Sequence, residues 1–195
     1  METKLKRDYY SNEDVVFLAK DLIGKVLCTN IQGQYSAGII SETEAYKGPE
    51  DRASHAYGNK RTNRTEIMFG EPGFAYVYLC YGIHKLFNVV SGPKDIPHAV
   101  LIRGTKPLEG IPIMEKRRSM KSTKKNFSSG PGTLTIALGL NMHHNKMDLE
   151  GDEVWIEDRN IPIKGSEIIQ GPRIGIDYSG PDKDLPYRFL WKLAK

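Results

Sequence analysis

ETEAYKGPEDRASH at residues 42–55 and FAYVYLCYGIHKLFNVV at residues 74–90 carry the most informative patterns of this sequence. The first continues from an apolar run and then alternates in polarity, which predicts a β-strand. Successive side chains of a strand point to opposite faces, so Glu42, Glu44 and Tyr46 are expected on one face. Because glutamate is depleted in strands, this face is either a solvated outer surface or a place where the carboxylates are used.

A turn is expected after this strand. Gly48-Pro49-Glu50-Asp51 has the residue types of a tight turn, and Asp51 is placed to cap a short helix over residues 52–55. Such a turn would bring His55 back towards Glu44 and Tyr46. A single histidine is a weak signal, so His55 becomes a candidate only in combination with the second segment.

The second segment predicts a protruding β-hairpin, because two runs rich in β-formers flank Gly82. Alternation puts Tyr76 and Tyr78 on one face of its first strand. Tyr81 falls at the turn and is expected at the tip. A tyrosine at such a tip either packs against its own turn or inserts as an aromatic wedge into a stack of bases.

Length and composition are those of an ordinary globular protein, and residues 1–195 are expected to form one domain. The net charge of +4 is compatible with nucleic-acid binding but does not single it out. Cys28 and Cys80 lie in apolar runs without CxxC spacing, which predicts buried, reduced thiols. No apolar run approaches membrane-spanning length, and the N-terminal residues lack the apolar core of a signal peptide. We therefore expect a cytoplasmic protein.

The remaining segments predict short strands and a few helices. An amphipathic helix over residues 11–23 is closed by Gly24 and precedes a hairpin with its turn at Gln32-Gly33. A further helix follows Gly130-Pro131-Gly132. Short C-terminal strands are expected at WIE (155–157), IIQG (168–171), RIGIDY (173–178) and residues 187–193. This mixture predicts the α+β class, with a curved, mainly antiparallel sheet flanked by a few helices.

Three other groups of polar residues are candidates for ligand contacts. The loop Lys60–Arg64 is basic and rich in hydroxyl groups, which is typical either of solvated surface or of phosphate contacts. Residues 116–125 form the densest basic cluster, either a solvated segment or a flank for a nucleic-acid backbone. His143 and His144 are adjacent rather than spaced to share a metal ion, so we expect no metal and no cofactor.

Many of these motifs together resemble a known family. The matching residues are E-T-E-A-Y-x-G-P-E-D-x-A-x-H from Glu42, M-F, P-G, Y-V-Y-x-x-Y-G, N-V, residues 100–103, 107–110, 130–134, 137–138, 172–176 and Arg188-Phe189. With them the chain resembles the alkyladenine (3-methyladenine) DNA glycosylase family from about Tyr10 to Phe189. Several fixed spacings that agree at once are far more specific than one short motif. The family's fold is of the α+β kind predicted above.

The resemblance implies a monofunctional DNA glycosylase of base excision repair. Such an enzyme flips an alkylated or deaminated purine out of damaged double-stranded DNA and hydrolyses its N-glycosidic bond, leaving an abasic site. The implied substrates are 3-methyladenine and, depending on the dimensions of the pocket, hypoxanthine and ethenoadenine. We expect a monomer without a cofactor, associated with the nucleoid when bound to DNA.

The implied roles fall on residues of the two segments and on three arginines. From spacing alone, Glu42 and Glu44 are rivals for the general base that activates a water, and the resemblance assigns this role to Glu44. The aromatic faces of Tyr46 and Tyr78 suit an extruded base. The full set is Glu44 as the catalytic base, Tyr46, His55, Tyr78 and Asn88 as the base pocket, Tyr81 as the intercalating residue, and Arg103, Arg61 and Arg64 as phosphate contacts.

Two other classes of function stay open on the residues. Glu44, Glu50 and Asp51 could bind the metal of a nuclease, and the tyrosines could serve a non-catalytic protein that binds damaged DNA or RNA. A related fold occurs in a formyltransferase domain that helps bind transfer RNA, so fold alone does not determine function. The presence of Glu44 beside aromatic residues favours an enzyme.

Overall fold

The chain folds around one long central strand, β3 (Gln34–Lys47). In the computed structural model, which describes residues 3–192, β3 pairs with β6 (His98–Glu109) along most of its length. On its other edge, β3 pairs first with β2 (Val26–Ile31) and then with β9 (Arg188–Trp191). The predicted turn at Gln32-Gly33 joins β2 to β3, and both residues have positive φ.

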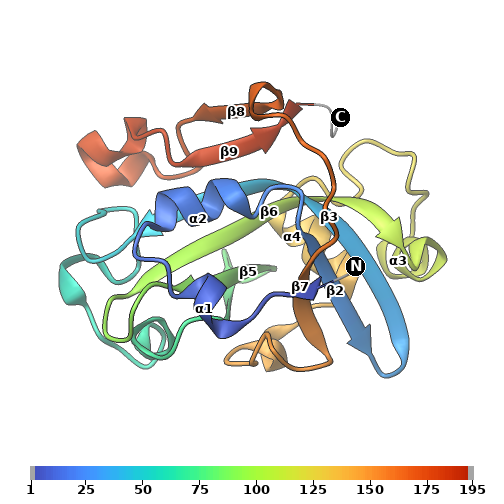
Figure 1. The fold of residues 1–195 in the computed structure, drawn as a ribbon, viewed down its shortest axis with the longest axis horizontal. Helices are drawn as coiled ribbons and strands as arrows, with labels where there is room; N and C mark the ends of the chain where they lie inside the picture. The colour runs from blue at the N-terminus through green and yellow to red at the C-terminus, as the bar shows by residue number, and fades with distance from the viewer. Residues whose placement is uncertain (1–2, 193–195) are drawn as a thin grey trace.

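The other strands extend this sheet on both sides (Figure 1). The order is β1 (Thr3–Lys4), β7 (Val154–Asp158), β2, β3, β6, β5 (His84–Ser91) and β4 (Ala75–Cys80), with β8 (Ile168–Gly171) attached to β9. The strand pairings within residues 3–192 are all antiparallel. A single antiparallel sheet with a few helices confirms the predicted α+β class.

Helix α2 (Val15–Asp21) shows how local sequence determines an element. Asp14 accepts hydrogen bonds of 3.0 Å from two backbone N–H groups of the first turn, which caps the helix. The hydroxyl of Thr43 on β3 donates a hydrogen bond of 2.6 Å to a backbone carbonyl of this helix and connects the helix to the sheet. Gly24, with a φ of 91°, lies just beyond the helix in the left-handed region that glycine tolerates. The helix predicted over residues 11–23 is therefore confirmed, with a later start.

The other helices are short. They are α1 (Arg7–Tyr10), α3 (Ile111–Arg118), α4 (Pro131–Leu138) and the 3₁₀ helices η1 (Tyr57–Asn59), η2 (Glu66–Phe69), η3 (Met142–His144), η4 (Gly165–Glu167) and η5 (Asp177–Asp184). Helix α4 packs on β5, β6 and α3, and it is the helix predicted after Gly130-Pro131-Gly132. Within residues 3–192, no helix combines the length and the apolar character needed to span a membrane.

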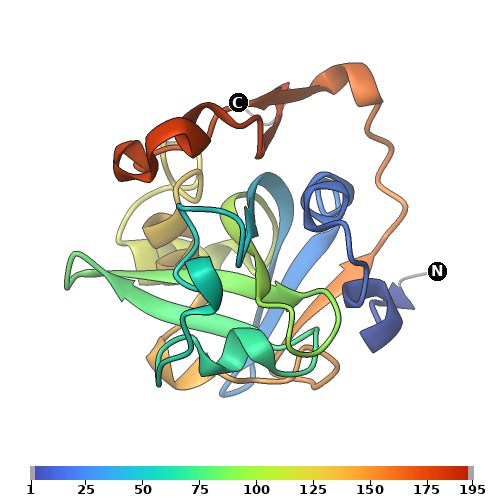
Figure 2. The same ribbon diagram turned by 90° about the vertical axis from the view of Figure 1, so that its left-hand side faces the viewer.

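Strands β4 and β5 form the predicted hairpin, which projects from the body of the molecule at the left of Figure 2. Tyr81 and Gly82 at its tip have φ values of 50° and 74°, the left-handed conformation that tight hairpin turns use. Near its base the hairpin rests on a small apolar cluster that includes Met68, Phe69 and Tyr76. The cluster anchors the hairpin while the tip stays exposed.

A bulge in β3 lies at the first glutamate. The register with β6 shifts on both sides of Glu42, which pairs with Gly104. A Cβ added to Gly104 would lie 3.3 Å from the Cβ of Glu42, so glycine provides room for this irregularity. Glu42 and Glu44 both contact Arg103, in agreement with the prediction that they share a face.

Two predictions of local structure are wrong. Residues 52–55 form turns and not a helix. The Asp51 carboxylate does accept a hydrogen bond from the N–H of Ala53, as a cap would. It also binds the N–H of Lys47 and the guanidinium of Arg173, and these contacts hold it in a turn. Residues 173–178 do not form a strand. The backbone N–H of Ile174 donates to a carboxylate instead of a neighbouring strand, and the next residue is a glycine with a φ of 77°.

Two other predictions need a smaller correction. Cys28 is buried as expected, but Cys80 is only half-buried, because it lies where the hairpin leaves the core. The last strand, predicted over residues 187–193, is β9 (Arg188–Trp191), and Leu193 lies outside the described residues.

Candidate active site

A cavity of about 670 Å³ lies beside the hairpin, and we call it the hairpin cavity. Its walls come from β4 and β5, from the start of α4 and from residues 174–178. A smaller inner cavity of about 30 Å³ shares four of its lining residues, Tyr46, His55, Tyr78 and Tyr178, and is also lined by Tyr76 and Asn88. The fold thus gathers predicted site residues from both informative segments around one place.

Glu44 lies directly behind the wall of the hairpin cavity and is fully buried. Its Oε1 accepts a hydrogen bond of 2.9 Å from the backbone N–H of Ile174 and lies 3.4 Å from Nη1 of Arg103. Its Oε2 accepts a hydrogen bond of 2.8 Å from the hydroxyl of Tyr46. All three partners line the cavity. The carboxylate is therefore separated from the cavity only by the groups that hold it.

The surroundings of Glu44 shift its ionisation. Burial raises the pKa of Glu44 above the ordinary value of 4.5, and Arg103, the Ile174 N–H and the Tyr46 hydroxyl oppose this rise without cancelling it. Burial and the nearby Glu44 raise the pKa of Tyr46 well above its ordinary value, so Tyr46 remains a hydroxyl donor. A held carboxylate of raised pKa next to a cavity has the properties of a general base.

Glu42 has different surroundings. Its Oε1 accepts hydrogen bonds from Nε of Arg103 at 3.1 Å and from Nε of Arg188 at 2.6 Å. It is buried and borders a different groove, not the hairpin cavity. Spacing in the sequence left Glu42 and Glu44 as rivals, and the structure separates their environments.

His55 is a neutral hydrogen-bonding group whose tautomer follows from its partners. Burial and the charge of Arg64 lower the pKa of His55 to about 4. Arg64 Nη2 lies 3.1 Å from Nε2 of the ring, and because a guanidinium only donates, Nε2 must accept. The proton of the neutral ring is then on Nδ1 and is donated to the hydroxyl of Tyr76 at 2.8 Å.

Tyr78 lies between a histidine and an arginine. The ring of His55 meets it edge-on at a centroid distance of 4.7 Å, and the guanidinium of Arg64 lies 4.7 Å from its centroid. Arg64 Nε also donates to the hydroxyl of Tyr76 at 3.2 Å. Arg64 therefore forms part of the cavity wall, whereas sequence analysis placed it in a basic loop as a phosphate contact.

Asn88 is buried on β5 and lines the inner cavity. Its side-chain Nδ2 donates a hydrogen bond of 3.0 Å to the backbone carbonyl of Tyr76, which is the residue opposite Asn88 in the β4–β5 ladder. Asn88 thus has a fixed place behind the aromatic residues.

Tyr81 at the hairpin tip is 87% exposed, so it does not pack against its own turn. Ile83, two residues later, is 70% exposed. Tyr81 also borders the hairpin cavity. Exposed apolar side chains at a projecting tip are typical of a surface that contacts a partner.

Arg61 and Arg103, the predicted phosphate contacts besides Arg64, lie in different surroundings. Arg61 is exposed and pairs with Glu66 at 2.7 Å and with Asp95 at 3.2 Å. The side chain of Arg103 is 14% exposed and faces the carboxylates of Glu42 and Glu44 while bordering the hairpin cavity.

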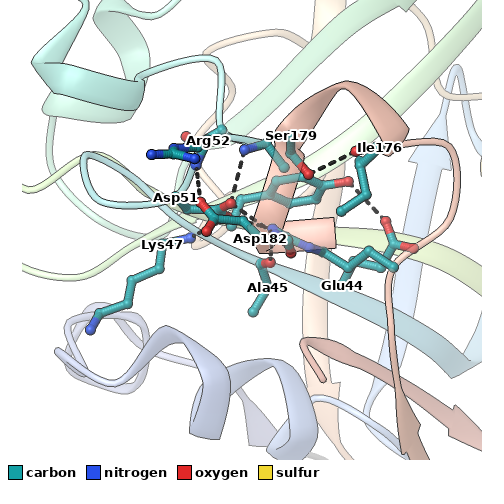
Figure 3. A network of polar contacts seen from close by, with 12 residues as sticks. Glu44, Ala45, Lys47, Asp51, Arg52, Ile176, Ser179 and Asp182 are labelled. Carbon is teal, nitrogen blue, oxygen red and sulfur yellow. Dashed lines mark hydrogen bonds and ion pairs between the residues drawn. The ribbon is translucent and has the colours of Figure 1, made fainter. Parts of the chain in front are cut away.

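Asp51 and Glu44 lie in one network of polar contacts (Figure 3), which includes a buried ion pair that sequence analysis did not assign. Arg173 binds both carboxylate oxygens of Asp51, with Nη2 to Oδ1 at 2.8 Å, and both side chains are almost completely buried. Arg173 also donates to the carbonyl of Ala45 on β3 at 2.9 Å and lies over the ring of Tyr46. The neighbouring Ile174 contacts Glu44. Both partners fall in matching motifs, but nothing in the sequence pairs residues that are 122 positions apart.

Tyr178 is a second residue that sequence analysis did not assign to the site. It borders both cavities, is 69% exposed, and its hydroxyl donates 3.2 Å to the carbonyl of Ala53. Its aromatic character was visible in the sequence, but its place depends on the path of residues 173–178, which was predicted wrongly.

The adjacent histidines lie near one carboxylate. Donor atoms of His143, His144 and Glu153 lie within 4.8 Å of one another. Nδ1 of His144 accepts from the backbone N–H of Asn141 at 2.8 Å, so in the neutral ring Nε2 carries the proton and faces Glu153 at 3.2 Å. A metal at this place would have to displace that proton, and the expectation of no metal stays a prediction.

Comparison with known proteins shows a similarity that covers almost the whole chain. The sequence profile of the methylpurine-DNA glycosylase family matches residues 8–195. A protein of Chlamydia abortus is 46% identical over 187 residues, covering 95% of this chain and 97% of that protein. A protein of Clostridium perfringens (strain 13) is 47% identical over an aligned length of 197 residues, covering 97% of this chain and 96% of that protein. Both relatives are provisionally named 3-methyladenine DNA glycosylase.

Proposed function

The chain belongs to the methylpurine-DNA glycosylase family, a family of DNA-repair hydrolases that act on N-glycosidic bonds, and we propose that it releases damaged purines from double-stranded DNA. The substrates on this proposal are 3-methyladenine, hypoxanthine and ethenoadenine, and the product is an abasic site. The observation that carries the proposal is the buried, donor-held carboxylate of Glu44 directly behind an aromatic cavity.

The first step is extrusion of the damaged nucleotide, because its glycosidic bond is out of reach inside the duplex. Tyr81 would enter the stack from the minor groove and fill the gap that the nucleotide leaves. Its exposure at the tip of a projecting hairpin supports this role, since insertion needs no rearrangement of the core.

The extruded base would stack against Tyr46 and Tyr78, and each such contact is worth about 1–3 kcal/mol. Alkylated purines that carry a positive charge gain roughly 0.5–2 kcal/mol more from electron-rich rings. His55 would hydrogen-bond to the purine edge. Asn88 would discriminate against the amino group of normal guanine, because it is fixed behind the pocket by its contact with the Tyr76 carbonyl.

Hydrolysis then requires a water at the anomeric carbon of the deoxyribose. Glu44 would take a proton from this water while the water oxygen bonds to the carbon, and the electrons of the breaking bond leave with the purine. Oε1 of Glu44 already accepts a hydrogen bond from the Ile174 N–H, so a water bound at this oxygen would share it with that N–H. General-base catalysis of this kind is worth roughly 10²–10⁴-fold, and the negative carboxylate also stabilises positive charge on the sugar.

Arg61, Arg64 and Arg103 would hold phosphates beside the extruded nucleotide. Arg61 is exposed and can exchange its surface carboxylates for a phosphate. Arg103 borders the cavity next to Glu44, so it would act close to the phosphate of the extruded nucleotide itself. We propose that the protein acts as a monomer and without a cofactor.

The test is base release from duplexes that carry one 3-methyladenine, hypoxanthine or ethenoadenine, in the presence of a metal chelator. We expect release of the free base and abasic strands that break only after alkali. Cleavage of the strand by pure protein without alkali would contradict a monofunctional glycosylase. Loss of all activity with the chelator would favour the metal-dependent alternative.

A lesion-binding protein without activity is the second candidate, and one observation favours it. Glu44 does not itself line the hairpin cavity, and its oxygens are already hydrogen-bonded. Tight binding of the same duplexes with no release of base would establish this alternative.

A further inference from the structure

A second groove of about 760 Å³ lies beside the hairpin cavity, and we call it the lysine groove. Residues 126–129 line the lysine groove, and the next residues, 130–133, line the hairpin cavity. Glu42, which borders the groove, is hydrogen-bonded to Arg103, which borders the cavity. The two hollows therefore share a wall. The groove is also lined by Lys106, Lys124, Lys125, Thr123, Phe127 and Trp191.

The groove is positively charged. Lys106, Lys124 and Lys125 are exposed, and within residues 3–192 none of them forms an ion pair with a carboxylate. Among the described residues that line the groove, Glu42 contributes the one carboxylate, and it is already shared by Arg103 and Arg188. The charge is therefore left for an anionic ligand.

Trp191 on β9 provides a second, independent observation. Its side chain is about nine-tenths buried, and in the described part of the chain its indole N–H has no hydrogen-bond acceptor. The ammonium group of Lys106 lies 5.5 Å from its ring. An indole nitrogen can only donate, and a buried donor without a partner is costly. Because the indole nitrogen is closed off from solvent, a ligand rich in acceptor oxygens would pair with the lysines at once and with the indole N–H after a small movement of the ring.

The segment that carries two of the groove lysines lies on the same side of the molecule as the tip of the hairpin. In Figure 2 the tip of the hairpin and the connection between α3 and α4, which carries the lysines at 124 and 125, both lie on the left. Helix α2 lies on the right in the same view. A strand that continues from the hairpin cavity along residues 126–133 would therefore reach the groove.

We propose that the lysine groove holds the phosphodiester backbone of the DNA next to the extruded nucleotide. Phosphate oxygens are acceptors with negative charge, which is the chemistry that the lysines, the hydroxyl of Thr123 and the indole N–H can bind. This inference rests on the proposed function, since the ligand is the same DNA. It assigns a role to the basic segment 116–125, of which only the lysines at 124 and 125 and the neighbouring polar residues line the groove.

The first test removes the charge of the groove. The double variant Lys124→Gln, Lys125→Gln should bind a duplex with a tetrahydrofuran abasic analogue about tenfold more weakly, with a salt slope smaller by about two between roughly 50 and 200 mM salt. Its base release at protein concentrations below saturation should fall in proportion to this loss of affinity. The matched control is Lys20→Gln, Lys164→Gln, which removes two exposed lysines on α2 and between β7 and β8 and should leave the slope unchanged.

The second test observes Trp191 directly. The chain has 2 tryptophans, so Trp155→Phe leaves Trp191 as the only one and Trp191→Phe leaves Trp155. We expect the fluorescence of the first variant to change when the same duplex saturates it, and that of the second to stay constant. The Trp191→Phe variant should also bind about fivefold more weakly, because it lacks the indole donor.

The outcomes separate this inference from the proposed function. If the wild type releases damaged bases but the lysine double variant keeps the wild-type affinity and salt slope, the groove does not bind DNA. The proposed glycosylase activity is then unaffected. An unchanged fluorescence of Trp191 at saturation would contradict the groove in the same way. If the wild type releases no base but the lysine variant still binds DNA more weakly, the result supports the groove as a DNA-binding site and contradicts the proposed glycosylase activity.

Discussion

At the scale of single residues, the burial of Glu44 determines the pH range in which the proposed reaction can run. Burial raises the pKa of Glu44 above 4.5, and a general base has to be ionised. The single-turnover rate should therefore rise with pH through an apparent pKa above 4.5 and become constant at higher pH. We call the fall of the rate at low pH the acid limb. An acid limb with an apparent pKa at or below 4.5 would contradict the role of Glu44.

The pKa of His55 is lowered to about 4, so its protonation would also reduce the rate at low pH. The variant His55→Asn serves as the control, because the acid limb should remain where it is when the histidine is absent. Disappearance of the limb in this variant would assign the titration to His55.

Tyr81 carries the second prediction at this scale. Replacing it by alanine should change the free energy of unfolding by less than about 0.5 kcal/mol, because the side chain is 87% exposed. Extrusion of ethenoadenine, followed by its fluorescence in the duplex, should weaken about tenfold, since a lost stacking contact is worth about 1–3 kcal/mol. Tyr81→Phe should retain extrusion. Wild-type extrusion and release by Tyr81→Ala would contradict the wedge.

At the scale of elements, the ion pair between Arg173 and Asp51 connects the C-terminal segment to β3 and to the turn after it. Through Ile174 it aligns an N–H group that favours the ionised form of Glu44. Arg173→Lys keeps the charge but loses the two-pronged contact. We expect lower thermal stability, slower base release, and an acid limb moved to higher pH, because the pKa of Glu44 rises when this N–H moves away.

Arg159→Lys is the matched control for this variant. Arg159 is also largely buried and pairs with Glu157 at 2.7 Å, and it does not line the hairpin cavity. This control should lower the melting temperature and leave the acid limb in place. If Arg173→Lys behaves in the same way as the control, the ion pair supports the fold but does not position Glu44.

At the scale of the whole molecule, the sequence predicted those features that depend on local pattern. The alternation around Glu44 and Tyr78 located β3 and the hairpin, and the apolar spacing before Gly24 located helix α2. The predictions of these elements succeeded because strand alternation, helix caps and turn residues act over a few positions. Of the residues that the resemblance named, six line the hairpin cavity (Tyr46, His55, Arg64, Tyr78, Tyr81 and Arg103), and their roles stay predictions.

Other features depend on contacts between distant parts of the chain and could not be predicted. Asp51 had the pattern of a helix cap, but its ion pair with Arg173 makes it part of a turn. Arg64 appeared to be a loop residue, and only the folded structure places it between His55 and Tyr78. The tautomer of His55 follows from this same contact. Long-range pairing of this kind leaves no local pattern in a single sequence.

The measurement that tests the central claim most directly is single-turnover release of hypoxanthine from a duplex by Glu44→Gln and by Glu42→Gln. Both changes are isosteric and lie two residues apart on one strand. We predict a loss of at least about 10²-fold with Glu44→Gln, with binding of the abasic analogue retained, and substantial release by folded Glu42→Gln. Wild-type rates with Glu44→Gln, or a comparable loss only with Glu42→Gln, would contradict the account.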